Sequence, residues 1–324
     1  MKKVILFVLG VSIYSTVCGQ IIRGTILDVT TKSGIPFASV YFNATFAGTT
    51  SDKDGNFELD VSNKGSMPLT ISAVGYFSVT LARFQAAKHL YISLTPKVYE
   101  LTEAHVKAKS LKAKRQRNLR LFREEFLGTS ANASKCKILN EKDISFNYDS
   151  DADTLKVFAL KPLEIENGAL GYKLTYYLDK FEYYRRRRST FFIGNMIFKD
   201  EVGTDSIQIK RYNTIRKETY RGSRMHFFRT LCGDTLKTKF VVQDPSGEEI
   251  KYKNLVFQID NNSYLEYPKN LHVSYDRDDS YIIFLKKPVY FDKTGYFDPS
   301  TINWKGIMGE QRIADWLPYE YKIE

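Results

Sequence analysis

Hydrophobic and polar residues alternate in short runs over the first third of the chain. Runs of this kind cover residues 24–28, 36–42, 57–61 and 69–74. Between the second and third runs, Asp52 and Asp54 can accept hydrogen bonds from backbone amides, and Gly55 tolerates the positive φ of a tight turn. Short strands separated by about eight to twelve residues predict a β-sandwich.

The alternation is preceded by a segment with three distinct parts. Lys2 and Lys3 are followed by an apolar run over residues 4–11 and then by small residues up to Gln20. This order is typical of a secretory signal peptide, so we expect residues 1–19 to be removed by cleavage before Gln20. The apolar run is shorter than the roughly 20 residues that span a bilayer. Lipid attachment at Cys18 is the less favoured alternative, because Val17 is bulkier than the residue usual at that position.

The periodicity changes from two to 3.6 residues near Lys107. Leu111, Leu119, Phe122 and Phe126 then fall on one helical face, and basic residues cover the rest. We expect residues 97–128 to contain a linker strand and a basic amphipathic helix. Packing of its apolar stripe on the following domain is favoured over binding to anionic lipid, because membrane-surface helices usually have a wider apolar face.

Strand patterns dominate residues 129–324. We therefore expect this region to form a larger, mostly antiparallel β domain with one or two helices, one of them at about residues 223–231. The strand patterns cover residues 154–160, 172–184, 190–198, 206–212, 239–243, 251–259, 271–275 and 281–285.

The residues of the first region are similar to those of a known family. Gly24, Asp28, Pro36, residues 48–50 with Asp54-Gly55, and Val74-Gly75-Tyr76 resemble the carboxypeptidase regulatory-like, or transthyretin-like, domain. The resemblance implies a seven-stranded β-sandwich over residues 20–96 that accompanies catalytic domains without performing chemistry. It also implies a Gram-negative cell envelope, where this module is found at the N-terminus of TonB-dependent receptors. Residues 100–108 resemble the strand that follows it there, and the later fragments resemble a second domain of uncharacterised envelope proteins.

The net charge bears on the expected partners, and the cysteine content bears on whether the protein has a disulfide. The net charge is +11. After export, the accessible anions are phosphorylated lipids, acidic glycans and peptidoglycan rather than nucleic acid. The run Arg185, Arg186, Arg187 and Arg188 is a candidate anion patch, although such runs are more often solvated. Cys136 and Cys232 remain after processing, and a disulfide and two buried free thiols are equally compatible with the sequence.

The search for reactive groups gives few candidates. The sequence has no metalloprotease, GxSxG or phosphate-loop motif, so we expect no catalytic residue, metal or cofactor. Residues 52–56 and 149–153 have calcium-like spacing, but both lack the later ligands and are better interpreted as turns. Asp276, Asp278 and Asp279 with Glu266 are weak glycosidase candidates. The most site-like group combines acids with aromatic residues and consists of Trp304, Glu310, Asp315 and Trp316.

These observations favour an exported, non-catalytic binding or scaffolding protein of the periplasm or outer-membrane surface. Its expected partners are an envelope protein or an anionic envelope component such as a glycan, with peripheral association at the outer membrane and no nucleic acid. A glycan-directed hydrolase and a small outer-membrane β-barrel are the alternatives.

Overall fold

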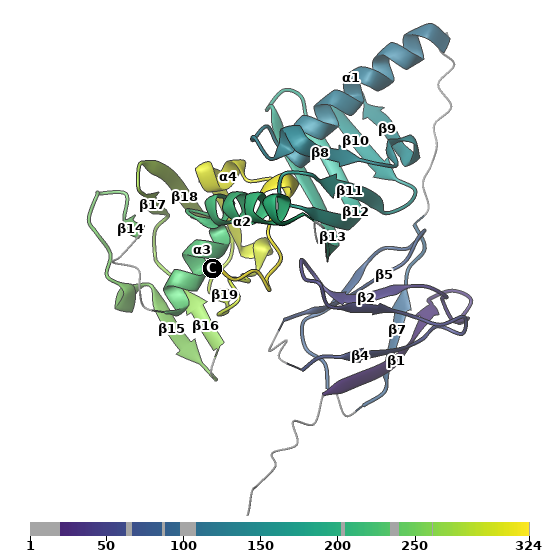
Figure 1. Cartoon of the computed structure of the whole chain (residues 1–324), viewed down its shortest axis with the longest axis horizontal. Coiled ribbons are helices and arrows are strands. Elements are labelled where there is room, and N and C mark those ends of the chain that lie inside the picture. Colours follow the sequence, from purple (N-terminus) through teal and green to yellow (C-terminus); the bar gives the residue numbers. More distant parts are fainter. Residues whose placement is uncertain are drawn as a thin grey trace, which may run out of the picture.

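The fold is mainly β, as the sequence predicted (Figure 1). The computed structural model describes residues 20–62, 67–85, 88–97, 108–201, 205–233, 240–260 and 262–323. The expected signal peptide with Cys18, and most of the predicted linker strand over residues 100–108, lie outside these ranges.

Residues 20–97 form the predicted sandwich of seven strands, within the part of them that the structure describes. One sheet has the order β4-β1-β7 and the other the order β3-β2-β5-β6. The side chains of Ile22, Ile26, Val40, Phe42 and Ile71 meet between the sheets with no exposed surface, and we call this cluster the sandwich core. The strands are β1 (Ile21–Asp28), β2 (Ser39–Phe42), β3 (Gly48–Thr50), β4 (Asn56–Asp60), β5 (Leu69–Ser72), β6 (Val79–Leu81) and β7 (Leu90–Leu94).

The turn before β4 has the predicted chemistry. Asp52 Oδ1 accepts hydrogen bonds from the backbone amides of Asp54 at 2.9 Å and Asn56 at 2.8 Å. Gly55 adopts a φ of +85°, and a Cβ there would lie 2.5 Å from the carbonyl oxygen of Ile26. The carboxylate of Asp52 is therefore a turn element, and a side chain at position 55 would be strained both by φ and by contact.

A six-stranded antiparallel sheet follows, with helix α1 (Ala108–Leu127) packed on it. Leu119, Phe122 and Phe126 are buried, so the predicted packing of the helix stripe is confirmed; the side chain of Leu111 lies outside the description. The buried side chains of α1 and of this sheet form one hydrophobic cluster, which we call the α1 core. The strands are β8 (Cys136–Ile138), β9 (Ile144–Asp149), β10 (Thr154–Ala159), β11 (Leu163–Asn167), β12 (Tyr172–Tyr184) and β13 (Ser189–Asp200).

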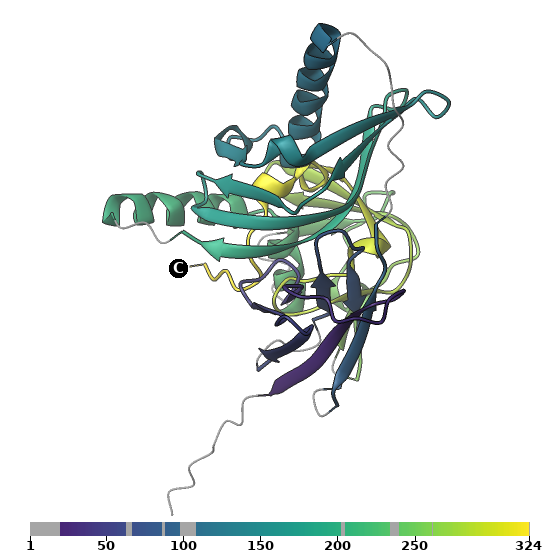
Figure 2. The ribbon, with the colours of Figure 1, turned by 90° about the vertical axis from the view of Figure 1, so that its right-hand side faces the viewer.

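Strand β12 lies between α1 and the sandwich. The ring of Tyr176 contacts Phe126 of α1, with ring centroids 4.9 Å apart, whereas the ring of the next residue, Tyr177, stacks on Tyr41 of the sandwich at 5.8 Å. Successive side chains of a strand point to opposite faces, which explains this division. Figure 2 shows the result, with α1 above the sheet and the sandwich below it.

Buried residues between Phe227 and Met308 form a second hydrophobic cluster around helix α3 (Arg224–Cys232), which we call the α3 core. Phe227 and Phe228 of α3 are fully buried there. Tyr220, Met225, Ile313 and Leu317 belong to the α1 core instead. One sheet has the order β14-β17-β18-β20 and the other the order β15-β16-β19. The strands are β14 (Phe240–Gln243), β15 (Val256–Ile259), β16 (Asn262–Leu265), β17 (Leu271–Tyr275), β18 (Asp278–Phe284), β19 (Val289–Phe291) and β20 (Ile302–Gly306). Short helices are η1 (Ala133–Lys135), η2 (Glu141–Asp143), η4 (Tyr252–Asn254), η5 (Pro299–Thr301), α4 (Ile307–Glu310) and η6 (Ile313–Asp315).

One predicted strand is wrong, and a second is correct only in its second half. Within the strand predicted at residues 251–259, residues 252–254 form the short helix η4 and the strand β15 begins at Val256. Residues 206–212 begin helix α2 (Ser206–Tyr220), whose N-cap Asp205 accepts a hydrogen bond from the amide of Ile207. Ile207 is exposed, and the residues that face the protein are Tyr212 and Tyr220, at helical spacing. The alternation of Ile207 and Ile209 is too short to distinguish the two-residue period of a strand from the 3.6-residue period of a helix. The helix predicted at residues 223–231 is confirmed as α3, with Ser223 as its N-cap.

Candidate functional site

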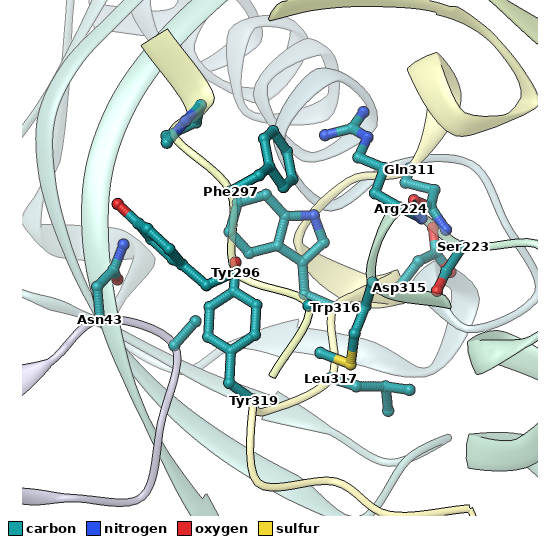
Figure 3. A pocket seen from close by; sticks show the side chains of 14 residues that line it. Asn43, Ser223, Arg224, Tyr296, Phe297, Gln311, Asp315, Trp316, Leu317 and Tyr319 are labelled. Atoms are coloured by element: carbon teal, nitrogen blue, oxygen red, sulfur yellow. Dashed lines mark hydrogen bonds between the residues drawn. The ribbon is translucent and has the colours of Figure 1, made fainter. Parts of the chain in front are cut away.

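A cavity of about 110 Å³ lies where the sandwich, the α1 core and the α3 core meet. Figure 3 shows its walls, in which aromatic rings lie between the polar side chains of Ser223, Arg224, Gln311 and Asp315 at one side and Asn43 at the other. We call it the junction cavity. Its lining comes from four separate parts of the chain, namely Asn43 and Ala44; Ser223, Arg224 and Met225; Gly295, Tyr296, Phe297 and Pro299; and Gln311, Asp315, Trp316, Leu317 and Tyr319.

The sandwich reaches the cavity through the loop after β2. The amide of Ala44 donates to the carbonyl of Met196, and the amide of Phe198 donates to the carbonyl of Thr45, both at 2.9 Å. The amide of Met196 also donates to Asn43 Oδ1 at 2.8 Å. Because β13 lies at an edge of its sheet, its outer backbone groups need partners, and this loop supplies them.

The C-terminal segment forms the opposite wall. The amide of Tyr319 donates to the carbonyl of Ala44 at 2.9 Å. The guanidinium of Arg229, on α3, donates to the carbonyls of Thr294 at 2.8 Å, Tyr321 at 2.8 Å and Tyr319 at 3.1 Å. One cation therefore joins α3, the loop after β19 and the chain end, and this arrangement places the Tyr319 ring beside the cavity.

Arg224 lines the cavity at the first position of α3. Its Nε donates to the carbonyl of Met308 at 2.7 Å, and its backbone amide donates to Gln311 Oε1 at 3.2 Å. Its two Nη atoms have no hydrogen-bond or ion-pair partner among the residues that the structure describes. Burial, with a smaller contribution from nearby Arg312, lowers the pKa of Arg224 to about 9, so the side chain keeps its charge at pH 7.

Residues 22–106 match the sequence model of the CarboxypepD_reg-like domain family. These residues are a carboxypeptidase regulatory-like domain. The match agrees with the seven-stranded sandwich, and this type of domain is non-catalytic. The match covers residues 22–106, so it describes the first domain alone.

The other comparisons add little to this assignment. No curated protein matches the chain significantly. A solved structure from Bacteroides fragilis NCTC 9343, described as membrane-associated and of unknown function, is similar at 10% sequence identity over 88% of this chain and 92% of that one. The TM-score of that pair is 0.19, which does not establish a shared fold. Within the described ranges, none of the helices is long and apolar enough to cross a membrane.

The structure divides the acidic and aromatic group that the sequence singled out. Asp315 and Trp316 line the junction cavity, whereas Trp304 is buried in the α3 core against Phe227 and Phe228, and Glu310 is exposed at the end of α4. Asp315 Oδ1 accepts hydrogen bonds from Ser130 Oγ at 2.7 Å and Asn132 Nδ2 at 3.0 Å.

The four consecutive arginines, Arg185 to Arg188, form the exposed tip of the β12–β13 hairpin. Arg185 lies over the Tyr148 ring at 4.5 Å, and Arg186 approaches Asp153 at 3.7 Å with 81% of its side chain exposed. The four side chains are exposed, and water screens an ion pair at such a position, so these contacts contribute little to stability.

Cys136 and Cys232 are free thiols. Cys136 packs against the α1 core from β8, and Cys232 packs against the α3 core at the end of α3. Burial, with a smaller effect of Asp315, raises the pKa of Cys136 to about 12; burial, with a smaller effect of Asp292, raises that of Cys232 to about 11. The structure has no disulfide between these two residues, and both thiols are half-buried rather than fully buried as the free-thiol alternative assumed.

The remaining acidic candidates serve local structure. Asp279 accepts from Ser274 Oγ at 2.9 Å and lies 2.8 Å from His272 Nε2, across strands β17 and β18. Ser274 Oγ is 3.5 Å from His272 Nε2 and its proton is directed to Asp279, so the group lacks the nucleophile–base contact of a hydrolytic triad. Asp149 pairs with Lys156 at 2.9 Å instead of forming part of a calcium loop. No group of metal-ligating residues occurs in the described ranges.

Arg224, Gln311 and Tyr319 were not predicted as site residues from the sequence. Ser223 was a usable signal, because it begins the helix that carries Arg224. Nothing local marks an arginine whose partners are a carbonyl and an amide oxygen more than 80 residues away.

Proposed function

We propose that this protein is an exported, non-catalytic binding protein of the cell envelope whose ligand occupies the junction cavity. The observation that carries the proposal is the cavity itself, because its aromatic walls and its few polar groups resemble the composition of small-molecule sites. A wall built from four separate parts of the chain is stable only when all of them are docked together.

Contacts between the regulatory-like domain and strand β12 hold that domain in place, which supports its role as one wall of the junction cavity. Lys97 Nζ lies 3.0 Å from Asp179 Oδ1, and 8% and 16% of the two side chains are exposed. Ser78 donates to the same carboxylate, and Ser39 Oγ lies 2.7 Å from the hydroxyl of Tyr177. A buried ion pair fixes geometry strongly because either charge alone would be costly in this position.

The leader pattern over residues 1–19 supports export to the envelope. The basic surface, which includes the tip of the β12–β13 hairpin, is suited to weak contact with anionic lipid or glycan there. We place the protein in the periplasm or at the outer-membrane surface on these grounds.

The hydrolase alternative receives less support from the geometry. Asp315 is the one acidic residue among the described residues that line the cavity. Two-carboxylate glycoside hydrolysis needs a second acid about 5 to 9 Å from the first and facing the same space. Glu310, the other acid in the group that the sequence proposed, does not line the cavity.

The proposal can be tested by blocking the cavity. Met225→Trp should fill it from α3, and Ile209→Trp is a matched control because Ile209 is exposed on α2. We expect a small molecule to co-purify from an envelope fraction with the wild-type protein and with Ile209→Trp, but not with Met225→Trp, as measured by mass spectrometry of the extracted protein. The same small molecules with all three proteins would contradict a ligand in the cavity. An uncleaved product in the cytosol would contradict export.

A further inference from the structure

Arg224 has unused binding capacity. A guanidinium presents five donors in a planar fork, and Nε is the one that Arg224 uses in a hydrogen bond within the described protein. The guanidinium also lies over the ring of Trp304, with Cζ 5.6 Å from the ring centroid, which leaves its remaining donors available. Its Nη1 and Nη2 have no partner in the described chain, although the side chain lines a partly enclosed space. A charged group removed from bulk water is costly without a partner, which favours an anion from outside the protein.

The charges near Arg224 increase this preference. Arg312 is the charge that acts most strongly on it, and it is a second cation. Arg312 is already used by the carbonyls of Glu125, Gly309 and Gln311. The carboxylate of Asp315 is bonded to Ser130 and Asn132, and no ion pair joins it to Arg224 in the described structure.

The shape of the cavity restricts the rest of the ligand. The junction cavity measures about 110 Å³ and is only partly enclosed. Since an enclosed cavity of about 150 Å³ holds benzene, a single ring is the largest group that the junction cavity can take, and part of the ligand must extend into its open mouth. The rings of Tyr296, Phe297, Trp316 and Tyr319 provide flat apolar surfaces, and Figure 3 shows Arg224 on the same side as Phe297 and Trp316. One ring therefore fits the walls, with its acidic group directed at Arg224.

We propose that the ligand of the junction cavity is a small carboxylate that carries a single ring, and that its carboxylate is bound by the two Nη atoms of Arg224. This inference rests on the proposed function and names its ligand class. A carboxylate matches the guanidinium fork with two parallel charge-assisted hydrogen bonds, whereas a neutral amide offers one acceptor and a donor that Arg224 would repel.

A matched pair of probes tests the inference. Phenylacetate and phenylacetamide have the same ring and nearly the same shape, but only the first is an anion. We expect the wild-type chain from Gln20 onward to bind phenylacetate at least tenfold more tightly than phenylacetamide at pH 7, measured by isothermal titration calorimetry or ligand-observed NMR. Arg224→Gln should remove the preference. Arg187→Gln should preserve it, because Arg187 lies at the exposed hairpin tip.

The outcomes separate this inference from the proposed function. Equal binding of both probes, lost in Met225→Trp, would overturn the role of Arg224 and leave the cavity as a binding site. Binding of neither probe at millimolar concentration would overturn the inference as well. The wild-type comparison needs no variant, so it decides the matter even if Arg224→Gln fails to fold.

Discussion

The tip of the β12–β13 hairpin and the junction cavity both contain arginines, but the two regions treat them in opposite ways. The hairpin carries four in succession, all exposed, with one weak ion pair and one ring contact among them. Near the cavity, Arg229 bonds three backbone carbonyls, and Arg224 bonds one while retaining two unpartnered nitrogens in the described structure.

From this difference we infer that the burial of an arginine, rather than the number of arginines, determines how much it contributes to stability and binding in this protein. An exposed arginine gains little from a nearby carboxylate because water screens the interaction. A partly buried one interacts in a lower effective dielectric, so each hydrogen bond that it makes or lacks matters more.

The largest effect is expected for Arg229→Met. The change removes a cation that donates to the carbonyls of Thr294, Tyr319 and Tyr321, and it leaves those carbonyls without their partner. Hydrogen bonds from charged groups each contribute about 1.5 to 3 kcal/mol, and because they are not additive we expect a loss of about 3 to 5 kcal/mol. Urea unfolding measures it. Arg187→Met is the control, and a loss below about 1 kcal/mol for Arg229→Met would contradict its role in joining the segments.

The parts of the fold that the sequence could predict are those that depend on neighbouring residues rather than on packing between distant ones. Strands β12 and β17 were predicted with the observed bounds because alternation persists along them with one face buried. Asp52 and Gly55 were assigned correctly because the chemistry of a turn involves only a few neighbouring residues. The first residues of α2 were misassigned because two isoleucines fit either period, and the helix is decided by packing of Tyr212 and Tyr220 farther along.

The cavity could be predicted only in part. Asp315 and Trp316 were identified because an acid next to an aromatic residue is a local signal. Arg224 was not, because its character comes from Met308, Gln311 and Arg312, which lie more than 80 positions away and approach it only after α3 and the C-terminal segment have docked. Local patterns likewise do not separate the α1 core from the α3 core, since each is assembled from distant strands.

A smaller effect is expected for Asp315→Asn. The side chain retains its shape and can still accept from Ser130 and Asn132, but it loses charge, so we expect a destabilisation of about 1 kcal/mol. Cys136 provides a second measurement. Its pKa is raised to about 12, mainly by burial and in smaller part by the charge of Asp315. A raised thiol pKa stabilises the folded state below the ordinary thiol pKa, and this stabilisation is lost as the pH rises towards 12.

Removal of the Asp315 charge should therefore lower the pKa of Cys136 and accelerate its alkylation at pH 9. Peptide mapping after treatment with iodoacetamide measures this rate. Cys232 is an internal control, because the charge that contributes to its raised pKa is Asp292. Equal acceleration at both cysteines would indicate general loosening of the fold and contradict the specific effect.

The smallest effect is expected when Arg185, Arg186, Arg187 and Arg188 are all changed to Gln. These side chains are exposed, and loss of the ion pair to Asp153 and the contact with Tyr148 should together change the free energy of unfolding by less than about 0.5 kcal/mol. Phenylacetate binding should also be unchanged, because none of the four lines the cavity. Removal of four charges would nevertheless weaken any contact with vesicles that contain anionic lipid, in a manner that added salt reproduces. If the quadruple variant instead lost more stability than Arg229→Met, the number of charges would outweigh their burial, and the contrast between the two regions would be reversed.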